Sequence, residues 1–174
     1  MQLPNLKHFF NPYIRVRNSK IHGKGVYARC DIKKGTKIIE YLGKKITHAE
    51  SEKLYEKMFE RHKKNPKKYA SVYTFTLDEN YDLNGGVWWN LAKFMNHSCS
   101  GNCESVMEED GTIVVYALKK IKKGDELVYN YGYEVENWED HPCRCGSKRC
   151  VGHIVNEIQW DKLKTLKSKS KKKK

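Results

Sequence analysis

Short runs of alternating apolar and polar residues follow one another along most of this chain, with turn-forming residues between them. Alternation with a period of two is typical of β-strands that bury one face. The runs predict strands over residues 13–17, 26–29, 37–41, 73–77, 113–118 and 126–133. Turns are predicted at Lys33-Lys34-Gly35, Asp78-Glu79-Asn80, Asp110-Gly111 and Lys122-Lys123-Gly124-Asp125.

One segment departs from this pattern and predicts a helix. Thr47-His48-Ala49-Glu50 fits a capping box, and the apolar residues Leu54, Met58 and Phe59 follow at helical spacing. Asn65-Pro66 is expected to end the helix. The pattern therefore predicts a mostly β chain with one clear helix, no internal repeat and one low-complexity segment, the lysine-rich C-terminus.

The length of 174 residues suits one compact domain with its own core. No apolar run approaches the length of a membrane span, and the N-terminus lacks the charged and apolar regions of a secretion signal. We therefore expect a soluble, intracellular protein with reduced thiols and no membrane partner.

Four of the six cysteines suggest a metal site. Cys99 closes the polar sequence Asn96-His97-Ser98-Cys99, and the chain later offers Cys143, Cys145 and Cys150. Three disulfides are the alternative for six cysteines, but clustered thiols in a reducing compartment more often bind metal. Four thiolates are what a closed structural zinc site requires. Cys30 is expected to be a small buried residue, and Cys103 stays open as a competing ligand.

The net charge of +13 is unevenly distributed. Eight lysines and no acid lie in residues 162–174, which leaves +5 for the rest of the chain. Because only Leu163 and Leu166 are apolar there, this tail is expected to be disordered and solvated. A weak, salt-sensitive contact with nucleic acid and a purely solubilising role are equally compatible with it. The basic stretch 61–68 is expected to be an exposed face at a helix end.

Three short motifs contain residue types suited to chemistry, although each also has an ordinary structural explanation. His22-Gly23-Lys24-Gly25 follows a predicted strand, and its glycines would let backbone approach a ligand, but such sequences are usually only turns. Asn96-His97 is also typical of a structural cap. Tyr129-Asn130-Tyr131-Gly132-Tyr133 is also compatible with simple aromatic packing.

The order of these motifs resembles the SET-domain protein lysine methyltransferases. The resemblance extends from Ile21 to Gly152, about three quarters of the chain. The segments that carry it are His22-Gly23-Lys24-Gly25-Val26-Tyr27, Glu40-Tyr41-Leu42-Gly43, Tyr73-Thr74-Phe75, Asn90-Leu91-Ala92-Lys93-Phe94-Met95-Asn96-His97-Ser98-Cys99, Gly124-Asp125-Glu126-Leu127-Val128-Tyr129-Asn130-Tyr131 and the cysteines from Cys143 to Cys150. The chain departs from the family pattern at Trp89, Lys93, Gly101 and Tyr131, the last because it follows Asn130 where an acid is commoner.

The resemblance implies an α+β fold, mostly β, built from several small sheets. It further implies one inserted helix, a knot-like threading of the C-terminal strand and a zinc-bound C-terminal loop segment. The chain would divide into an N-terminal flank (1–14), a SET domain (15–133), a post-SET zinc segment (134–157) and a basic lysine-rich tail (158–174).

The resemblance also implies S-adenosylmethionine (S-adenosyl-L-methionine) as methyl donor and a structural Zn²⁺. The cofactor-binding residues would be His22, Lys24, Gly25, Tyr73, Asn96 and His97. The metal ligands would be Cys99, Cys143, Cys145 and Cys150, and we expect this zinc segment to supply the last wall of the cofactor pocket. The catalytic residues would be Tyr131, Tyr73 and Tyr129, with Tyr131 nearest the transferred methyl group.

The substrate implied is a lysine in a basic protein, either histone or a histone-like chromatin protein. Acids at 134, 136, 139 and 140 and at 78, 79 and 82 would favour a basic peptide if they flank the lysine channel, although ordinary charged loops explain them equally well. The lysine tail is a second candidate substrate through automethylation. Tyr129, in place of phenylalanine, favours mono- or dimethylation in this family.

Two other function classes stay open: a non-catalytic peptide-binding module, and a zinc-containing basic nucleic-acid-binding protein. Retention of Tyr73 and Tyr131 argues against the first. The lack of a basic helix beside the metal argues against the second. A methyltransferase of this kind would be nuclear or chromatin-associated in a eukaryote or a host cell, and otherwise cytoplasmic. The oligomeric state does not follow from the sequence.

Overall fold

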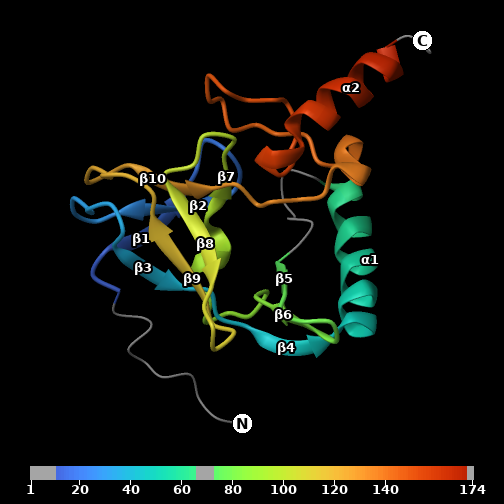
Figure 1. Ribbon diagram of the computed structural model, residues 1–174. Helices are drawn as coiled ribbons and strands as arrows, with labels where there is room; N and C mark the ends of the chain where they lie inside the picture. Colours follow the sequence, from blue (N-terminus) through green and yellow to red (C-terminus); the bar gives the residue numbers. More distant parts are fainter. Residues whose placement is uncertain (1–10, 66–72, 172–174) are drawn as a thin grey trace.

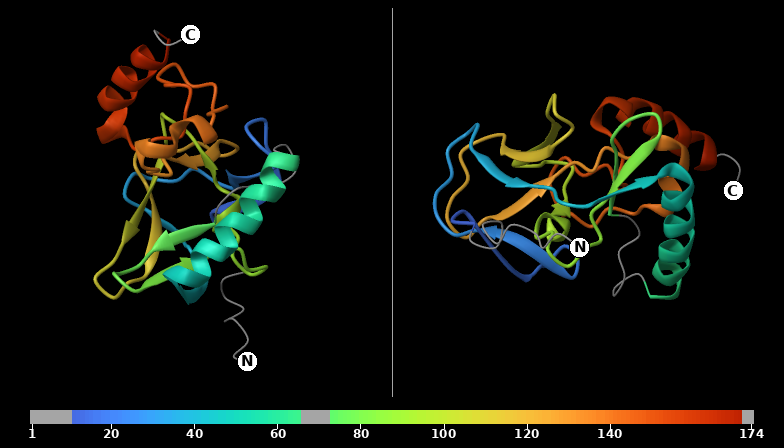
Figure 2. Two further views of the ribbon diagram at one scale, coloured as in Figure 1. Left: turned by 90° about the vertical axis from the view of Figure 1, so that its right-hand side faces the viewer. Right: turned by 90° about the horizontal axis from the view of Figure 1, so that it is seen from below.

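The computed structural model describes residues 11–65 and 73–171, in which three small β-sheets hold most of the ordered backbone. The sheets have the strand orders β1-β2-β10-β7, β3-β9-β8 and β4-β6-β5. Two helices, α1 and α2, lie on the same side of the molecule, away from β1 and β3 (Figures 1 and 2). The expected mostly β architecture of small sheets is confirmed.

The four-stranded sheet joins segments that are far apart in the chain. β1 (Ile14–Asn18) and β2 (Lys24–Ala28) form an antiparallel hairpin, and β10 (Glu126–Tyr129) pairs antiparallel with β2. β10 also pairs in parallel with the two-residue strand β7 (Asn96–His97), with Tyr129 opposite His97. This parallel register places the Asn-His sequence beside the strand that leads to Tyr131.

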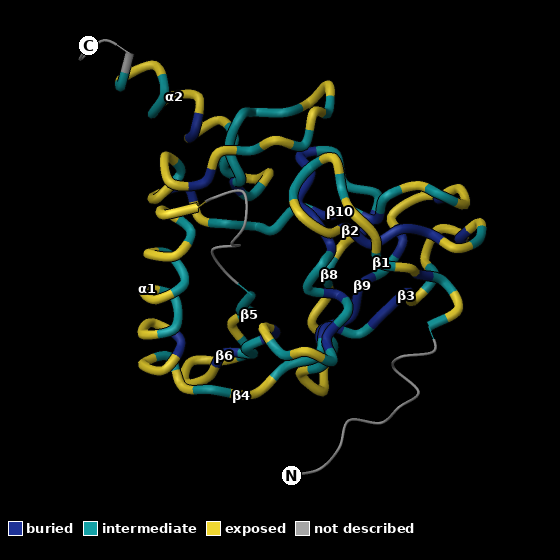
Figure 3. Tube along the Cα trace, turned by 180° about the vertical axis from the view of Figure 1, so that it is seen from behind, coloured by how far each residue is buried: buried dark blue, intermediate teal, exposed yellow. Residues whose placement is uncertain are grey.

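The second sheet supplies much of the hydrophobic core. It consists of β3 (Lys37–Glu40), β9 (Ile113–Ala117) and β8 (Cys103–Met107). Val114 and Val115 of β9 are almost completely buried, as are Val26 and Leu127 in the neighbouring sheet. Full burial of such a side chain stabilises the fold by about 1.5–3 kcal/mol relative to exposure. Figure 3 shows that buried residues concentrate in this half of the molecule, whereas both helices are mostly exposed.

The third sheet carries α1. β4 (Lys44–Thr47), β6 (Tyr81–Asn84) and β5 (Thr74–Thr76) form it, and α1 (His48–Lys64) starts directly after β4. The predicted capping box is confirmed, because the Glu50 backbone amide donates to Thr47 Oγ1 at 3.3 Å and the Thr47 amide donates to Glu50 Oε2 at 2.8 Å. Asn65 caps the other end, whereas Pro66 lies outside the described residues.

The expectation of a disordered tail over residues 162–174 is wrong for residues 162–171. α2 (Trp160–Lys171) is a helix whose Leu163 is only 1% exposed, packed with Val135 and Val155 in a second, smaller core that Leu166 also joins. Leu163 and Leu166 are three residues apart and therefore lie on one helix face. This one apolar face packs the first turns of α2 against the segment that contains Val135 and Val155. Residues 172–174 lie outside the described part.

Other expectations about local structure were also incomplete. The strand predicted over 126–133 ends at Tyr129, and the chain then turns at Gly132, which has φ +69°. The strands at 44–47, 81–84 and 103–107 and the short 3-10 helices at 92–94, 135–140 and 157–159 were not predicted. β4 has Ile46 as its one apolar residue. β6 alternates only over four residues, and there the polar Asp82 is buried while Tyr81 is exposed. In the described ranges, neither helix combines the length and apolar character needed to cross a membrane.

Candidate active site and metal centre

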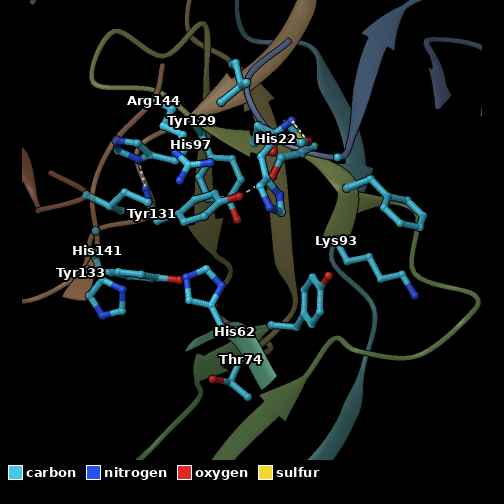
Figure 4. A pocket seen from close by; sticks show the side chains of 18 of the residues that line it. His22, His62, Thr74, Lys93, His97, Tyr129, Tyr131, Tyr133, His141 and Arg144 are labelled. Atoms are coloured by element: carbon cyan, nitrogen blue, oxygen red, sulfur yellow. Dashed lines mark hydrogen bonds between the residues drawn. The ribbon is translucent and has the colours of Figure 1, made fainter. Parts of the chain in front are cut away.

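A cavity of about 890 Å³ lies where the separate segments of the fold meet. Its walls come from the β1–β2 loop, β5, the residues around β7, the chain after β10 and the start of the C-terminal segment. The cofactor and catalytic residues expected from the sequence that line it are His22, Lys24, Tyr73, Asn96, His97, Tyr129 and Tyr131. Figure 4 shows several of these side chains converging on one space.

Asn96 fastens the β1–β2 loop to the cavity wall. Its side-chain NH₂ group lies within hydrogen-bond distance of three acceptors. These are the backbone carbonyls of His22 (3.3 Å) and Lys24 (3.0 Å) and the carboxylate of Glu126 (2.8 Å). Asn96 is only 7% exposed, so these contacts satisfy a buried polar group. The amide thereby fixes the loop on which His22 and Lys24 approach the cavity.

Gly25 is the one expected cofactor residue that does not line the cavity. A Cβ at this position would lie 2.3 Å from Glu126 Oε1, so the missing side chain makes room for that carboxylate. Glu126 also accepts hydrogen bonds from Ser19 (2.7 Å) and Tyr27 (2.9 Å). Sequence reasoning did not select Glu126. An acid at the first position of an otherwise apolar strand was the signal.

Tyr131 is held at both ends. Its phenol donates to the Met95 carbonyl at 2.8 Å, and its backbone N–H donates to His97 Nδ1 at 3.2 Å. Burial raises the pKa values of Tyr129 and Tyr131 well above 10, and neighbouring tyrosines raise them further. Both residues are therefore neutral phenols at physiological pH.

Further aromatic side chains surround this pair. The rings of Tyr129 and Tyr133 lie 5.1 Å and 5.6 Å from that of Tyr131. Tyr41 donates its hydroxyl to the Tyr73 carbonyl at 3.1 Å and meets Phe75 edge to face at 4.7 Å. Tyr41 and Tyr133 were not selected as site residues from the sequence. Together these rings give the cavity an aromatic wall without a buried negative charge.

His97 connects the aromatic wall to the cysteines. The imidazole is buried, and desolvation lowers its pKa to about 4, so it is neutral at physiological pH. Because Nδ1 accepts the Tyr131 N–H, the ring hydrogen belongs on Nε2. Nε2 lies 3.5 Å from Cys99 Sγ.

The four cysteines expected to bind metal come together. The Sγ atoms of Cys99, Cys143, Cys145 and Cys150 all lie within 4.8 Å of one another, and Cys99 is 3.7 Å from Cys143 and 4.0 Å from Cys150. Tetrahedral coordination with Zn–S bonds of about 2.3 Å places sulfurs roughly 3.8 Å apart, so the arrangement fits Zn²⁺.

The surroundings of these sulfurs also suit thiolates. The Cys145 and Gly152 backbone amides donate to the sulfurs of Cys143 and Cys150, each at 3.4 Å. Cys103 lies in β8 inside the main core and belongs to no metal-ligating group in the described ranges. It is therefore excluded as the competing ligand, and Cys30 lies outside the group as well.

The acids expected near a lysine channel do not form one surface. Glu134 and Asp140 line the cavity, whereas Glu136 pairs with Lys162 of α2 at 2.7 Å. Asp82 is 7% exposed and lies 3.2 Å from His48 at the start of α1. Basic residues that sequence reasoning did not select also line the cavity, namely His62, His141 and Arg144.

The position that departs from arginine in the family pattern has a defined role in this chain. Lys93 donates to the Val87 carbonyl at 2.7 Å, and its ammonium lies 5.1 Å from the centre of the Phe94 ring. Lys24 approaches the same ring at 5.3 Å. Desolvation and the charge of Lys24 lower the pKa of Lys93. Lys93 therefore makes one carbonyl contact and one contact with an aromatic face.

Comparisons with known proteins agree with this geometry. The family model "SET domain" matches residues 23–132. The chain is 35% identical over 157 residues to "Histone-lysine N-methyltransferase trithorax" of Drosophila virilis, which covers 88% of this chain and 4% of that protein. It is 34% identical over 154 residues to "Histone-lysine N-methyltransferase 2B" of Homo sapiens, covering 86% of this chain and 5% of that protein.

A solved structure with the same fold is a humanized mutant of the Chaetomium thermophilum Polycomb Repressive Complex 2 bound to the inhibitor GSK126. The two share 28% identity and a TM-score of 0.57, over 68% of this chain and 15% of that one. The chain therefore spans only a small part of each of these proteins. Because the family model covers more than half of the 174 residues, the chain belongs to the SET-domain family.

Proposed function

We propose that this protein is a protein-lysine N-methyltransferase that uses S-adenosylmethionine. The observation that carries the proposal is the position of Tyr131, fixed through its phenol and its backbone amide on the wall of an aromatic cavity. Relatives named as histone-lysine N-methyltransferases support it.

The residues around the β1–β2 loop fit a bound S-adenosylmethionine. His22 and Lys24 would approach its amino-acid end, Asn96 would keep their loop in place, and Tyr73 and His97 would complete the walls. Neutral aromatic faces suit its sulfonium, since π faces attract cations. When bound, S-adenosylmethionine supplies an electrophilic methyl group and a positive charge.

The aromatic wall would prepare the substrate lysine. A free lysine amine has a pKa of about 10.4, so deprotonation at neutral pH costs roughly 4–5 kcal/mol. Burial among Tyr41, Phe75 and Tyr129 would remove the ammonium from water, and the positive charge of a bound S-adenosylmethionine would repel it. Both effects lower that cost. These phenols stay uncharged, so they offer no counter-ion that would stabilise the ammonium again.

Tyr131 would orient the amine rather than remove its proton. Its phenol hydrogen is engaged by the Met95 carbonyl, which leaves the oxygen lone pairs free to face the reacting groups. A neutral phenol with a strongly raised pKa is a poor proton acceptor, so the amine proton leaves to water. The tyrosine contributes alignment, which is worth several kcal/mol in transfer reactions.

The substrate proposed is a basic chromatin protein, histone or histone-like, modified to the mono- or dimethyl state. Glu134 and Asp140 at the cavity would attract a basic peptide. A relative from Emericella nidulans is named "Histone-lysine N-methyltransferase, H3 lysine-4 specific", and this chain is 35% identical to it over 12% of its length. Such a substrate would place the protein at chromatin.

The test is transfer of a labelled methyl group from S-adenosylmethionine to core histones, to a basic bacterial or archaeal chromatin protein, and to the protein alone. We expect label in one of the two added proteins, and none with Tyr131→Phe. Label only in the protein alone would instead identify automethylation of its own lysines. Cofactor and peptide binding without transfer would favour a non-catalytic module and would refute the proposal.

A further inference from the structure

Three groups on one short segment link the metal centre to the catalytic tyrosine. Met95 offers its carbonyl to the Tyr131 phenol, His97 offers Nδ1 to the Tyr131 backbone N–H, and Cys99 belongs to the metal cluster. His97 belongs to the two-residue strand β7, and Met95 and Cys99 lie two positions before and after it. The parallel pairing of β7 with β10 holds this segment beside the chain that leads to Tyr131.

The two ring nitrogens of His97 have different and complementary partners. Tyr131 N–H can only donate, so Nδ1 must carry a lone pair. The hydrogen then lies on Nε2, which faces Cys99 Sγ at 3.5 Å, within reach of an N–H···S hydrogen bond. The two contacts together therefore select the tautomer with its hydrogen on Nε2.

We propose that the His97 ring is a positioning residue that transmits the state of the metal centre to Tyr131. A metal-bound Cys99 thiolate accepts the Nε2 hydrogen, fixes the ring, and thereby presents Nδ1 to the Tyr131 amide. This role of the side chain is distinct from the cofactor contact expected of the same residue. The part that concerns alignment of Tyr131 rests on the proposed methyl transfer.

The backbone around Tyr131 explains why it needs such support. The residue lies beyond Tyr129, where the backbone pairing of β10 with β7 ends, and the next residue, Gly132, turns the chain. The His97 ring also packs edge to face against the Tyr131 ring at 5.4 Å. Displacement of the His97 imidazole would therefore remove the hydrogen-bond acceptor of the Tyr131 backbone amide and the packing against one side of the Tyr131 ring.

Two substitutions test separately the hydrogen bond from His97 to Cys99 and the hydrogen bond from the Tyr131 amide to His97. His97→Asn keeps an oxygen where Nδ1 lies and removes the donor to Cys99. His97→Gln keeps an N–H where Nε2 lies and removes the acceptor for Tyr131. With Co²⁺ as probe, we expect His97→Asn to shift the sulfur-to-cobalt absorption band and to weaken metal binding about 10–100-fold in chelator competition. We expect His97→Gln to keep the band and to lose hydrogen-exchange protection at the Tyr131 amide, with a lower kcat.

His141→Asn is the matched control, because His141 is a buried imidazole in the same cavity that contacts Tyr133 instead of Tyr131. Its cobalt band and Tyr131 amide protection should equal those of the parent. In the parent, nitrogen NMR should report the Nε2–H form. An Nδ1–H form, an unchanged band in His97→Asn, or unchanged amide protection in His97→Gln overturns the proposal. These readouts need no turnover, so they decide it even if no methyl transfer is found.

Discussion

The Tyr131 phenol donates a hydrogen bond of 2.8 Å to the backbone carbonyl of Met95, 36 positions earlier in the chain. This bond fixes the direction of the phenol hydrogen and with it the direction of the oxygen lone pairs. The pairing of β7 with β10 brings the two residues together, so the sheet positions the tyrosine that we propose to align the reaction.

Replacing Tyr131 with phenylalanine should nearly eliminate turnover. The ring and its packing against Tyr129 and His97 would remain, but the hydroxyl that orients the amine would be lost. We expect kcat to fall about 100-fold or more, the cost of misalignment in a transfer reaction. Steady-state rates with labelled S-adenosylmethionine measure this, and calorimetry should find cofactor affinity within a few-fold of the parent.

Tyr116→Phe is the control for loss of a tyrosine hydroxyl, because Tyr116 bonds to Glu108 away from the cavity. Its turnover should match that of the parent. A fully active Tyr131→Phe would remove the proposed role of the hydroxyl.

Replacing Tyr129 with phenylalanine should raise the methylation state of the product. Tyr129 is buried beside Tyr131, so removal of its hydroxyl enlarges the polar end of the lysine channel without a change of charge. We expect more di- and trimethyl-lysine in mass spectra of a substrate peptide at equal conversion. An identical product distribution would mean that Tyr129 does not limit the product.

Removal of the metal should abolish cofactor binding as well as activity. Cys143, Cys145 and Cys150 tie the C-terminal segment to Cys99, and Pro142 and Arg144 of that segment line the cavity. Metal binding of this kind contributes folding energy directly. Cys99→Ser should lose zinc and cofactor affinity together, while Cys30→Ser, outside the cluster, should keep both. Parent-like cofactor affinity in verified zinc-free protein would show that the segment is not part of the cofactor site.

The sequence predicted the elements that depend on local signals and missed those that depend on distant contacts. The capping box of α1 and the cysteine spacing are local, and both are found in the structure. Glu126 stands out locally as an acid at the start of an apolar strand, but its three donors, Ser19, Tyr27 and Asn96, come from distant parts of the chain. The same holds for the contact of Cys99 with His97, which only the fold of the intervening backbone determines.

Replacing Leu163 with alanine tests the origin of the helix that the sequence did not predict. The side chain is 1% exposed in the small core with Val135 and Val155, so its truncation leaves a cavity. We expect a loss of about 2–5 kcal/mol in the free energy of unfolding, measured by urea denaturation, or separate early melting of the C-terminal segment. Leu166→Ala, at a half-buried position, should cost less. Equal small effects would mean that α2 is not held by this core.

The ion pair between His48 and Asp82 should make the attachment of α1 depend on pH. A hydrogen bond to Asp82 raises the pKa of His48 above 6.5. Burial of Asp82 alone would raise the pKa of its carboxyl group. Hydrogen bonds from Ser51, His48 and Thr76 outweigh this effect and lower the pKa of Asp82 below 3.8. The His48 contribution is therefore present below pH 6.5 and is lost as pH rises through the raised pKa. The Asp82 contribution is present above about pH 3.8 and is lost as pH falls through the lowered pKa.

Both residues of this pair are charged at pH 5.5, whereas His48 loses its charge as the pH rises through its raised pKa. A double-mutant cycle with His48→Asn and Asp82→Asn should therefore give a larger coupling energy in urea denaturation at pH 5.5 than at pH 8.5. Lys45→Gln, which removes the more exposed ion pair between Lys45 and Asp78, is the control. Its effect on the free energy of unfolding should be equal at the two pH values. Equal coupling at the two pH values would show that the contact stabilises α1 as a neutral hydrogen bond and not as an ion pair.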